Sequence, residues 1–389
     1  MDENKLYWIW LTLKLGHSNK IKKLIEIYGS IENIYNCENY SDITDSKIVD
    51  LLKDKSLDKA KKVYNDTINA GAFILTYDSP DYPECLKHIY EPPFVLYAKG
   101  NMFDWDSFIG IGVVGTRDCD AYGIDATKYF AGELAKNDIM IISGLARGID
   151  AVAAKAAIDA GKPTVGVLGC CIDEIYPRCN EDLFHMIEAE GVLLSEYGPG
   201  MPTGKWSFPQ RNRIISGLSK GVLVTQAPKR SGALITARLA YENGRDVFAV
   251  PGNFNNELCV GTNRLIADGG ICAGDVGDIL REYPEYSIKK PEIIRYYKNE
   301  NKPVIFEKTD NEVKKENNSV NSKEEKKPDF SGLNDIQKKI CECIVSGNNH
   351  IDMMVREIGV SAGKLNNEFL MMEIEGIIKS YPGNKYGIN

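Results

Sequence analysis

The chain has 389 residues, 43% of them hydrophobic and 26% charged, with a formal net charge of −8. This length favours two or three domains, and the acidic balance argues against a protein coated in basic patches. No run approaches the roughly 20 apolar residues of a membrane span. The N-terminus, MDENKLYWIW, lacks the basic start of a signal peptide, so a cytoplasmic protein without a membrane segment is expected.

Ten cysteines and four histidines are scattered along the chain. The pairs Cys170-Cys171 and Cys341-x-Cys343 have neither the C-x-x-C spacing of a zinc or redox site nor histidines at zinc-site spacing. Reduced thiols, no metal site and no catalytic histidine are therefore expected.

Residues 1–70 predict a small domain of short helices, because apolar residues recur at helical spacing between Gly16 and Gly29 and on either side of them. The pattern resembles a SAM-like, helix-hairpin-helix unit. Such units either grip a DNA backbone or serve as packing modules, and packing is favoured here.

Residues 71–286 alternate between apolar, β-branched runs and helical stretches, which predicts a Rossmann-like α/β domain with a doubly wound, mostly parallel sheet. The runs TVGVLG and GVLVTQ are apolar on both faces, as buried strands must be. The predicted strands are 109–115, 139–143, 164–169, 191–196, 221–226 and 246–251. The predicted helices between them are 122–135, 151–160, 180–189, 210–217 and 233–243.

Residues 287–330 are rich in Lys, Glu and Asn and predict a flexible linker. Residues 331–389 predict a winged-helix-like domain, with helices at 335–346, 352–358 and 362–375 followed by two short strands around Pro382. The third helix carries Glu368, Glu373 and Glu375 against Lys364, a charge unsuited to a DNA major groove. A protein-interaction or regulatory module is therefore favoured.

The carboxyl ends of the predicted strands carry glycine, hydroxyl and basic residues. A ligand of a parallel sheet sits beyond these ends. Glycine lets backbone N–H groups approach an oxygen closely, and Arg matches phosphate geometry with two parallel bonds. Convergence of five such loops predicts a ligand with several phosphates. The candidate site residues are Gly115, Thr116, Arg117, Ser143, Gly144, Arg147, Arg178, Gln210, Arg211, Arg213, Lys229, Ser231 and Gly232.

Charge distribution supports the same region, since residues 197–241 contain seven basic residues and no Asp or Glu. The alternative is a solvated basic face without a ligand. A nicotinamide site is disfavoured, because Gly110-x-Gly112-x-x-Gly115 falls inside a predicted strand and no acidic residue ends the next strand. No Walker-type G-x-x-x-x-G-K-[ST] occurs in the sequence. No bound cofactor is expected.

Several long motifs in this order resemble the DNA processing protein A (DprA/Smf) family, over residues 74–280. They are VVGTRDCDAYG, SGLARGID, YPRCN, SEYGPG, FPQRNRIISG and GTNRLIADGG. The resemblance implies a bacterial cytoplasmic homodimer that binds single-stranded DNA, protects incoming strands and loads the RecA recombinase in natural transformation. It implies phosphate contacts at Arg117, Arg178 and Lys229, with Gln210, Arg211, Arg213 and Arg147 nearby.

Structural roles compete with these assignments. Arg147 could instead pair with Asp150 and fix the start of the helix. Arg211 and Arg213 are two residues apart on a helix and face different ways, so one of them can have a structural role instead of contacting the ligand. Asp150 and Asp246 are expected to brace loops or cap helices. Ser143 is expected in a turn or at a phosphate rather than as a nucleophile, because no histidine lies in the motifs.

Two other functions remain open at this stage. Nucleotide hydrolases of the LOG type have a motif similar to P-G-G-x-G-T-x-x-E. At the corresponding place this chain has Pro251-Gly252-Asn253 and Gly261-Thr262-Asn263-Arg264-Leu265, so the acidic residue of the motif is missing. An adaptor that binds only protein is the second. A non-enzymatic DNA-binding protein is favoured, with Tyr176, Trp206 and Phe208 as stacking candidates.

Overall fold

The computed structural model describes residues 2–16, 18–284, 293–296, 303–304, 334–345, 377–381 and 385–388, with residues 354, 358, 365, 368, 369 and 372. The chain divides into two compact units, Met1–Thr309 and Asp310–Asn389. None of the helices in these described residues is long and apolar enough to cross a bilayer.

The first unit contains a nine-stranded sheet with the order β1-β2-β7-β6-β5-β4-β8-β9-β10. Its six central strands run parallel to one another and coincide with the six predicted strands, which confirms the Rossmann-like α/β fold. They are β4 (Gly110–Val114), β5 (Met140–Ser143), β6 (Thr164–Leu168), β7 (Val192–Ser195), β8 (Gly221–Val224) and β9 (Asp246–Ala249).

Two strands extend the sheet in the opposite direction, which the sequence did not predict. β2 (Val95–Gly100) is antiparallel to β7, and β1 (Phe73–Thr76) is antiparallel to β2. Both precede the strand–helix alternation, so periodicity gave no register for them. At the other edge, β10 (Ile271–Cys272) lies parallel to β9.

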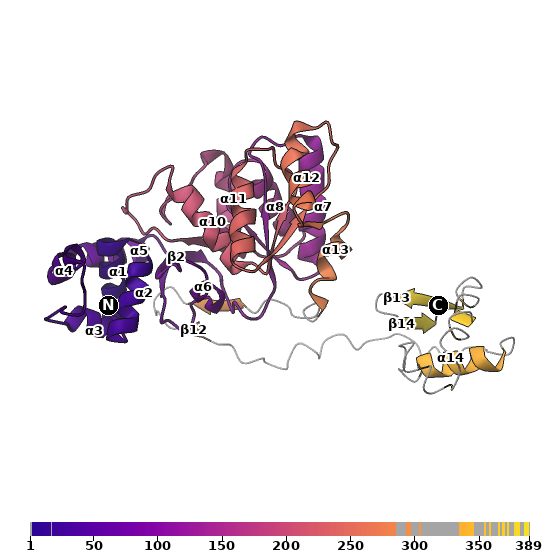
Figure 1. Ribbon diagram of the computed structural model, residues 1–389, viewed down its shortest axis with the longest axis horizontal. Helices are drawn as coiled ribbons and strands as arrows, with labels where there is room; N and C mark the ends of the chain where they lie inside the picture. Colours follow the sequence, from indigo (N-terminus) through magenta and orange to yellow (C-terminus); the bar gives the residue numbers. More distant parts are fainter. Residues whose placement is uncertain are drawn as a thin grey trace, which may run out of the picture. The chain divides into compact units, whose positions relative to one another are not determined.

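Helices cover both faces of the sheet (Figure 1). Apolar residues of α7, α8 and α13 pack with β4, β5 and β8 in one core, and those of α10 and α11 pack on the other face with α6. The helices are α6 (Glu84–Lys87), α7 (Ala121–Lys136), α8 (Ile149–Asp159), α9 (Glu181–Glu190), α10 (Ser207–Leu218), α11 (Gly232–Glu242), α12 (Val260–Ala267) and α13 (Val276–Leu280).

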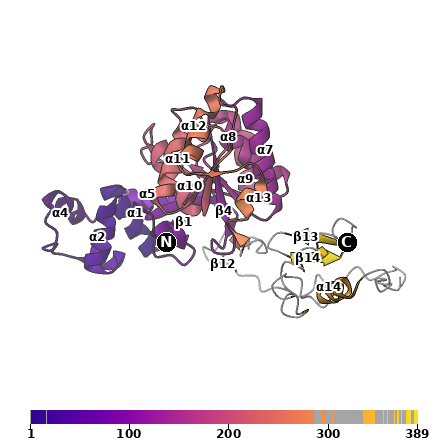
Figure 2. The same cartoon turned by 45° about the vertical axis from the view of Figure 1, so that its right-hand side comes forward.

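The N-terminal helices form a group of their own in Figure 2 but share a hydrophobic core with the sheet. Trp8 of the first helix stacks on Phe94 beside β2, with ring centroids 5.9 Å apart, and both side chains are buried. These helices therefore pack against the α/β part instead of standing apart from it. They are α1 (Glu3–Leu15), α2 (Asn19–Tyr28), α3 (Ile31–Asn36), α4 (Ser46–Lys53) and α5 (Asp58–Asn69).

Part of the segment predicted as linker forms strands. β11 (Ile293–Tyr296) pairs antiparallel with β3 (Met102–Phe103), and β12 (Pro303–Val304) pairs with β11. The apolar pair Ile293-Ile294 lies opposite Phe103 and Met102, so a local apolar patch inside a polar segment extends the first unit.

The second unit contains α14 (Asp335–Val345) and the antiparallel pair β13 (Ile378–Tyr381) and β14 (Lys385–Ile388), as predicted for its first helix and its two strands. Ile340, Leu365 and Ile378 belong to one buried cluster. The predicted helices 352–358 and 362–375 lie outside the described residues, apart from six isolated positions.

Two glycines of α7 give opposite predictions for substitution by alanine. A Cβ at Gly132 would meet no atom within 4 Å, whereas a Cβ at Gly123 would lie 2.2 Å from Oε1 of Gln226. Gly132→Ala should raise the free energy of unfolding by about 1 kcal/mol through helix propensity. Gly123→Ala should lower it by about 1–3 kcal/mol through overpacking. Urea denaturation followed by circular dichroism measures both, and a destabilising Gly132→Ala would contradict this packing.

Candidate nucleic-acid-binding site

The candidate site lies at the point where the strand order of the sheet reverses. From β4 the chain moves through α7 to β5, β6 and β7 on one side, and it returns to place β8 on the other side of β4. The loops after β4 and β8 therefore diverge to opposite faces of the sheet. This divergence leaves a crevice at the carboxyl edge, where open α/β sheets hold their ligands.

A groove of about 620 Å³ occupies this crevice. Its wall includes Gly115, Thr116 and Arg117 after β4, together with Ser231 and Gly232 before α11. An adjoining cavity of about 230 Å³ includes Gly144 and Arg147 after β5. The two cavities share Arg117, Ala146, Tyr176, Phe208 and Arg211, so they form one continuous groove.

The loop after β4 is held closely against its neighbours. The N–H of Thr116 donates to the carbonyl of Gln226 after β8 at 2.8 Å, and the carbonyl of Thr116 accepts from the N–H of Ile149 at 3.2 Å. A Cβ at Gly115 would lie 2.5 Å from Cγ1 of Ile149. Gly115 thus lets the start of α8 pack against this loop, and the G-x-G-x-x-G of the sequence is a packing feature centred on β4.

A buried arginine braces the middle of the site. Arg211 on α10 is only 4% exposed, and its Nη1 donates to the carbonyls of Gly144 and Val167. Burial lowers the pKa of its guanidinium to about 10, against the opposing charge of Asp150. Arg211 therefore remains protonated at neutral pH. It joins α10 to the ends of β5 and β6.

Asp150 completes this arrangement, in the loop-bracing role predicted for it. Its Oδ2 accepts from the N–H of Gly144 at 3.1 Å. Burial raises the pKa of its carboxyl, and the nearby charge of Arg211 opposes that rise. Ser143 is fully buried, donates to the carbonyl of Asp150 at 3.0 Å and accepts from the N–H of Leu145. Ser143 is thus a turn residue.

Two further predicted site residues do not line the groove. Arg213 forms an ion pair with Glu196, and both side chains are largely buried. The Oε1 of Gln210 accepts from the hydroxyl of Tyr197 at 3.2 Å. Both Arg211 and Arg213 therefore have structural partners, whereas the sequence analysis expected a structural role for only one of the two.

Arg147 is exposed, and its Nη2 donates to Oδ1 of Asp118 at 2.6 Å. The predicted alternative partner, Asp150, is wrong, because that carboxylate is buried and holds the backbone of Gly144. The exposed pair of Arg147 and Asp118 sits at the groove wall, where such pairs contribute little to stability.

The exposed cations of the site come from different loops. Arg117 follows β4, while Lys205 and Arg230 line the groove from the segments before α10 and α11. Arg178 and Lys229 are exposed beside lining residues, Arg178 between Pro177 and Cys179 and Lys229 between Pro228 and Arg230. Lys205 and Arg230 were not among the predicted site residues, although both belong to the acid-free stretch 197–241.

Aromatic side chains flank the same groove. Tyr176 is 53% exposed, and its ring centroid lies 5.2 Å from that of Phe208. Phe208 packs closely against Gly169, because a Cβ at Gly169 would lie 2.6 Å from the Phe208 ring. Trp206 is 52% exposed and meets the ring of Tyr197 edge-on. Tyr176 and Trp206 thus offer free ring surface, while Phe208 is also part of the packing.

Among the described residues, no group of three His, Cys, Asp or Glu side chains is placed to hold a metal ion. Burial raises the pKa of the Cys170 thiol to about 12 and that of the Cys171 thiol to about 11. Their thiolate fraction at neutral pH is therefore very small.

Asn263 closes the loop after β9, donating to the carbonyl of Gly252 and accepting from its N–H, both at 3.0 Å.

A Rossmann-like sheet with a polar groove at its switch point defines the class of α/β ligand-binding proteins. Residues 73–284 match the family model described as DNA recombination-mediator protein A. The chain belongs to this family. The resemblance drawn from the sequence motifs is thereby confirmed.

Characterised relatives and solved structures agree with this assignment. The chain is 42% identical to "DNA processing protein DprA" of Bacillus subtilis over 57% of its own length and 75% of that protein's. A crystal structure of DNA processing protein A from Streptococcus pneumoniae is 34% identical, with a TM-score of 0.61, covering 71% of this chain and 97% of that one. The protein from Helicobacter pylori, described by its single-stranded DNA binding mode, is 30% identical with a TM-score of 0.50, covering 55% and 96%.

Arg211 and Arg117 should respond differently to substitution. Arg211→Ala leaves two carbonyls and the carboxylate of Asp150 without their buried cation, so we expect a loss of about 3–5 kcal/mol in unfolding free energy. Arg117→Ala removes an exposed side chain and should change stability by at most about 0.5 kcal/mol. Chemical denaturation of both variants tests this, and equal stabilities would show that Arg211 is not the brace described.

Proposed function

We propose that this protein binds single-stranded DNA without enzymatic turnover, holding the strand backbone in the groove at the switch point of its sheet. The observation that carries the proposal is the convergence of Arg117, Lys205 and Arg230 on one groove in a protein of net charge −8. A localised cationic groove attracts a polyanion even when the average charge is negative.

The loop before α11 supplies a second element of phosphate recognition. Ser231 caps this helix, its hydroxyl accepting from the N–H of Ala233 at 3.3 Å, and Gly232 lines the groove without a side chain. The N-terminus of a helix favours a bound anion because its first N–H groups have no partner within the helix. Arg178 and Lys229 on the rim are then placed to meet the neighbouring phosphates.

The exposed rings provide for the bases. Single strands are held by basic grooves in which aromatic side chains stack on successive bases, a contact that tolerates any sequence. Tyr176 lines the groove and Trp206 is exposed next to Lys205, which also lines it. We assign base stacking to these two residues and infer weak sequence preference.

The family and its relatives support the biological setting. The matching model describes a DNA recombination mediator, and the Helicobacter pylori relative is described by its single-stranded DNA binding. On this basis we propose a cytoplasmic homodimer that protects incoming strands and loads the RecA recombinase during natural transformation. The proposal involves no metal and no bound cofactor.

Removing one exposed cation should weaken binding measurably. We expect Arg117→Ala or Lys229→Ala to raise the Kd for an oligothymidylate about tenfold or more, since charge-assisted contacts contribute about 1.5–3 kcal/mol. Lys220→Ala is the control, because this exposed lysine precedes β8 at the opposite edge of the sheet. Fluorescence anisotropy measures the Kd, and unchanged affinity in both folded variants would sink the site assignment.

Binding should also fall steeply with added salt, because each phosphate contact releases about 0.7 counterion from a single strand. The slope of log K against log salt counts the phosphates engaged. Salt-insensitive binding would contradict the backbone-holding role, and hydrolysis of a nucleoside monophosphate would favour the LOG-type enzyme instead. No binding at all would favour an adaptor that recognises only protein.

We further propose that residues 331–389 form a winged-helix-like module that contacts protein rather than DNA. The acidic residues Glu368, Glu373 and Glu375 support this. Deleting 331–389 should leave the Kd for single-stranded DNA within about twofold, since acidic residues repel a polyanion. The same anisotropy titration tests it, and a loss of more than tenfold would contradict the proposal.

A further inference from the structure

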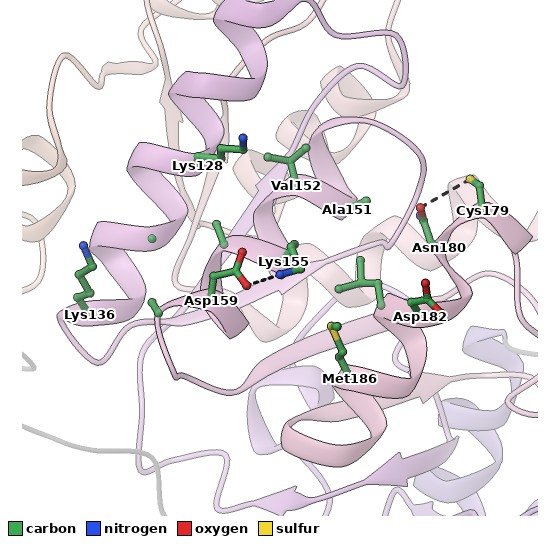
Figure 3. A pocket seen from close by; sticks show the side chains of 14 residues that line it. Lys128, Lys136, Ala151, Val152, Lys155, Asp159, Cys179, Asn180, Asp182 and Met186 are labelled. Atoms are coloured by element: carbon green, nitrogen blue, oxygen red, sulfur yellow. Dashed lines mark hydrogen bonds and ion pairs between the residues drawn. The ribbon is translucent and has the colours of Figure 1, made fainter.

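We infer that the DNA strand does not end in the groove described above but continues into a second groove on the outer surface of α7, α8 and α9. This inference rests on the proposed function, because it extends the path of the same ligand. The second groove has a volume of about 680 Å³ and adjoins the first at Cys179, which lines both. Figure 3 shows it from close by, with Lys128 and Lys136 on α7 and Cys179 at the far end.

The junction between the two grooves is firmly built. The side-chain amide of Asn180 donates to the carbonyl of Leu145 at 3.0 Å, tying the start of α9 to the loop after β5. Exposed Arg147 lines the first groove together with Cys179, and exposed Arg178 precedes Cys179 in the chain. A strand that leaves the first groove at Cys179 therefore meets two cations.

Charge continues along the second groove. Lys128, Lys136 and Lys155 line it, against Asp159 and Asp182. Lys155 pairs with Asp159 and Lys136 pairs with Glu133, but all four side chains are exposed. Exposed pairs contribute about 0–1 kcal/mol, so these lysines can exchange a carboxylate for a phosphate at small cost.

The floor of the groove suits bases rather than further phosphates. Ala151, Ala156 and Ala160 come from α8, while Leu183 and Met186 come from α9. Met186 is exposed although it is a large apolar residue. A basic wall beside an apolar floor matches a single strand, whose charged backbone and apolar base faces lie on different sides. An acidic amphipathic helix shares this polarity, but continuity with the first groove favours the strand.

The test compares short and long oligonucleotides on the full chain. One binding fold covers roughly 4–16 nucleotides, so an oligothymidylate of about 6 nucleotides fits within a single site and one of about 24 extends beyond it. We expect Lys128→Glu to weaken binding of the long oligonucleotide about tenfold and to leave the short one within about twofold. Lys220→Glu is the matched control, with the same charge change on an exposed lysine at the opposite edge of the sheet.

A second variant fills the groove without changing its charge. Gly132 lines it on α7, and a Cβ there meets no atom within 4 Å, so Gly132→Trp has room to enter the groove from the helix. This variant should also weaken only the long oligonucleotide. Circular dichroism and thermal unfolding show whether each variant is folded.

The outcomes separate this inference from the proposed function. If wild-type protein binds neither oligonucleotide, the proposed function fails first. If the short oligonucleotide binds but Lys128→Glu and Gly132→Trp leave the Kd of the long one unchanged, the second groove is not part of the path of the strand. A protein ligand would then be the favoured occupant of this groove. Equal losses for both lengths would also overturn the inference, because the effect would then arise in the first groove.

Discussion

The buried guanidinium of Arg211 holds the groove in shape. It reaches from α10 across the sheet edge to the carbonyls that end β5 and β6, beside the carboxyl of Asp150, which holds the N–H of Gly144. Burying a charge is costly unless its donors find acceptors. Meeting that requirement fixes α10, the loop after β5 and the end of β6 relative to one another, and so the exposed cations around them are presented from a rigid frame.

Basic residues are concentrated around the groove, although acidic residues outnumber them in the chain as a whole. The chain carries 55 acidic and 47 basic residues, yet residues 197–241 have no acid at all. Acidic surface elsewhere repels a polyanion, whereas the cationic groove attracts one, so this charge distribution favours an anionic ligand at the groove alone. Two acidic residues line the groove: Asp118 is paired with Arg147, and the buried Asp150 lies beside Arg211.

Much of the fold could be predicted from sequence because buried parallel strands leave long apolar runs at regular intervals. β1 and β2 were missed because they precede that alternation, and β11 because its apolar pair is isolated in a polar segment. The position of the groove followed from strand ends alone. Which arginine faces solvent did not: Arg211 and Arg117 look alike in sequence, and only the packing of α10 against β6 buries one of them.

The stacking of Trp8 on Phe94 has a consequence for how this protein tolerates change. The N-terminal helices and the sheet share one apolar core, so we expect the two parts to unfold together. A substitution that weakens the packing of α1 should then lower the amount of folded protein in the cell. Genetic loss of function that maps to these buried positions is therefore expected to reflect abundance and proteolysis.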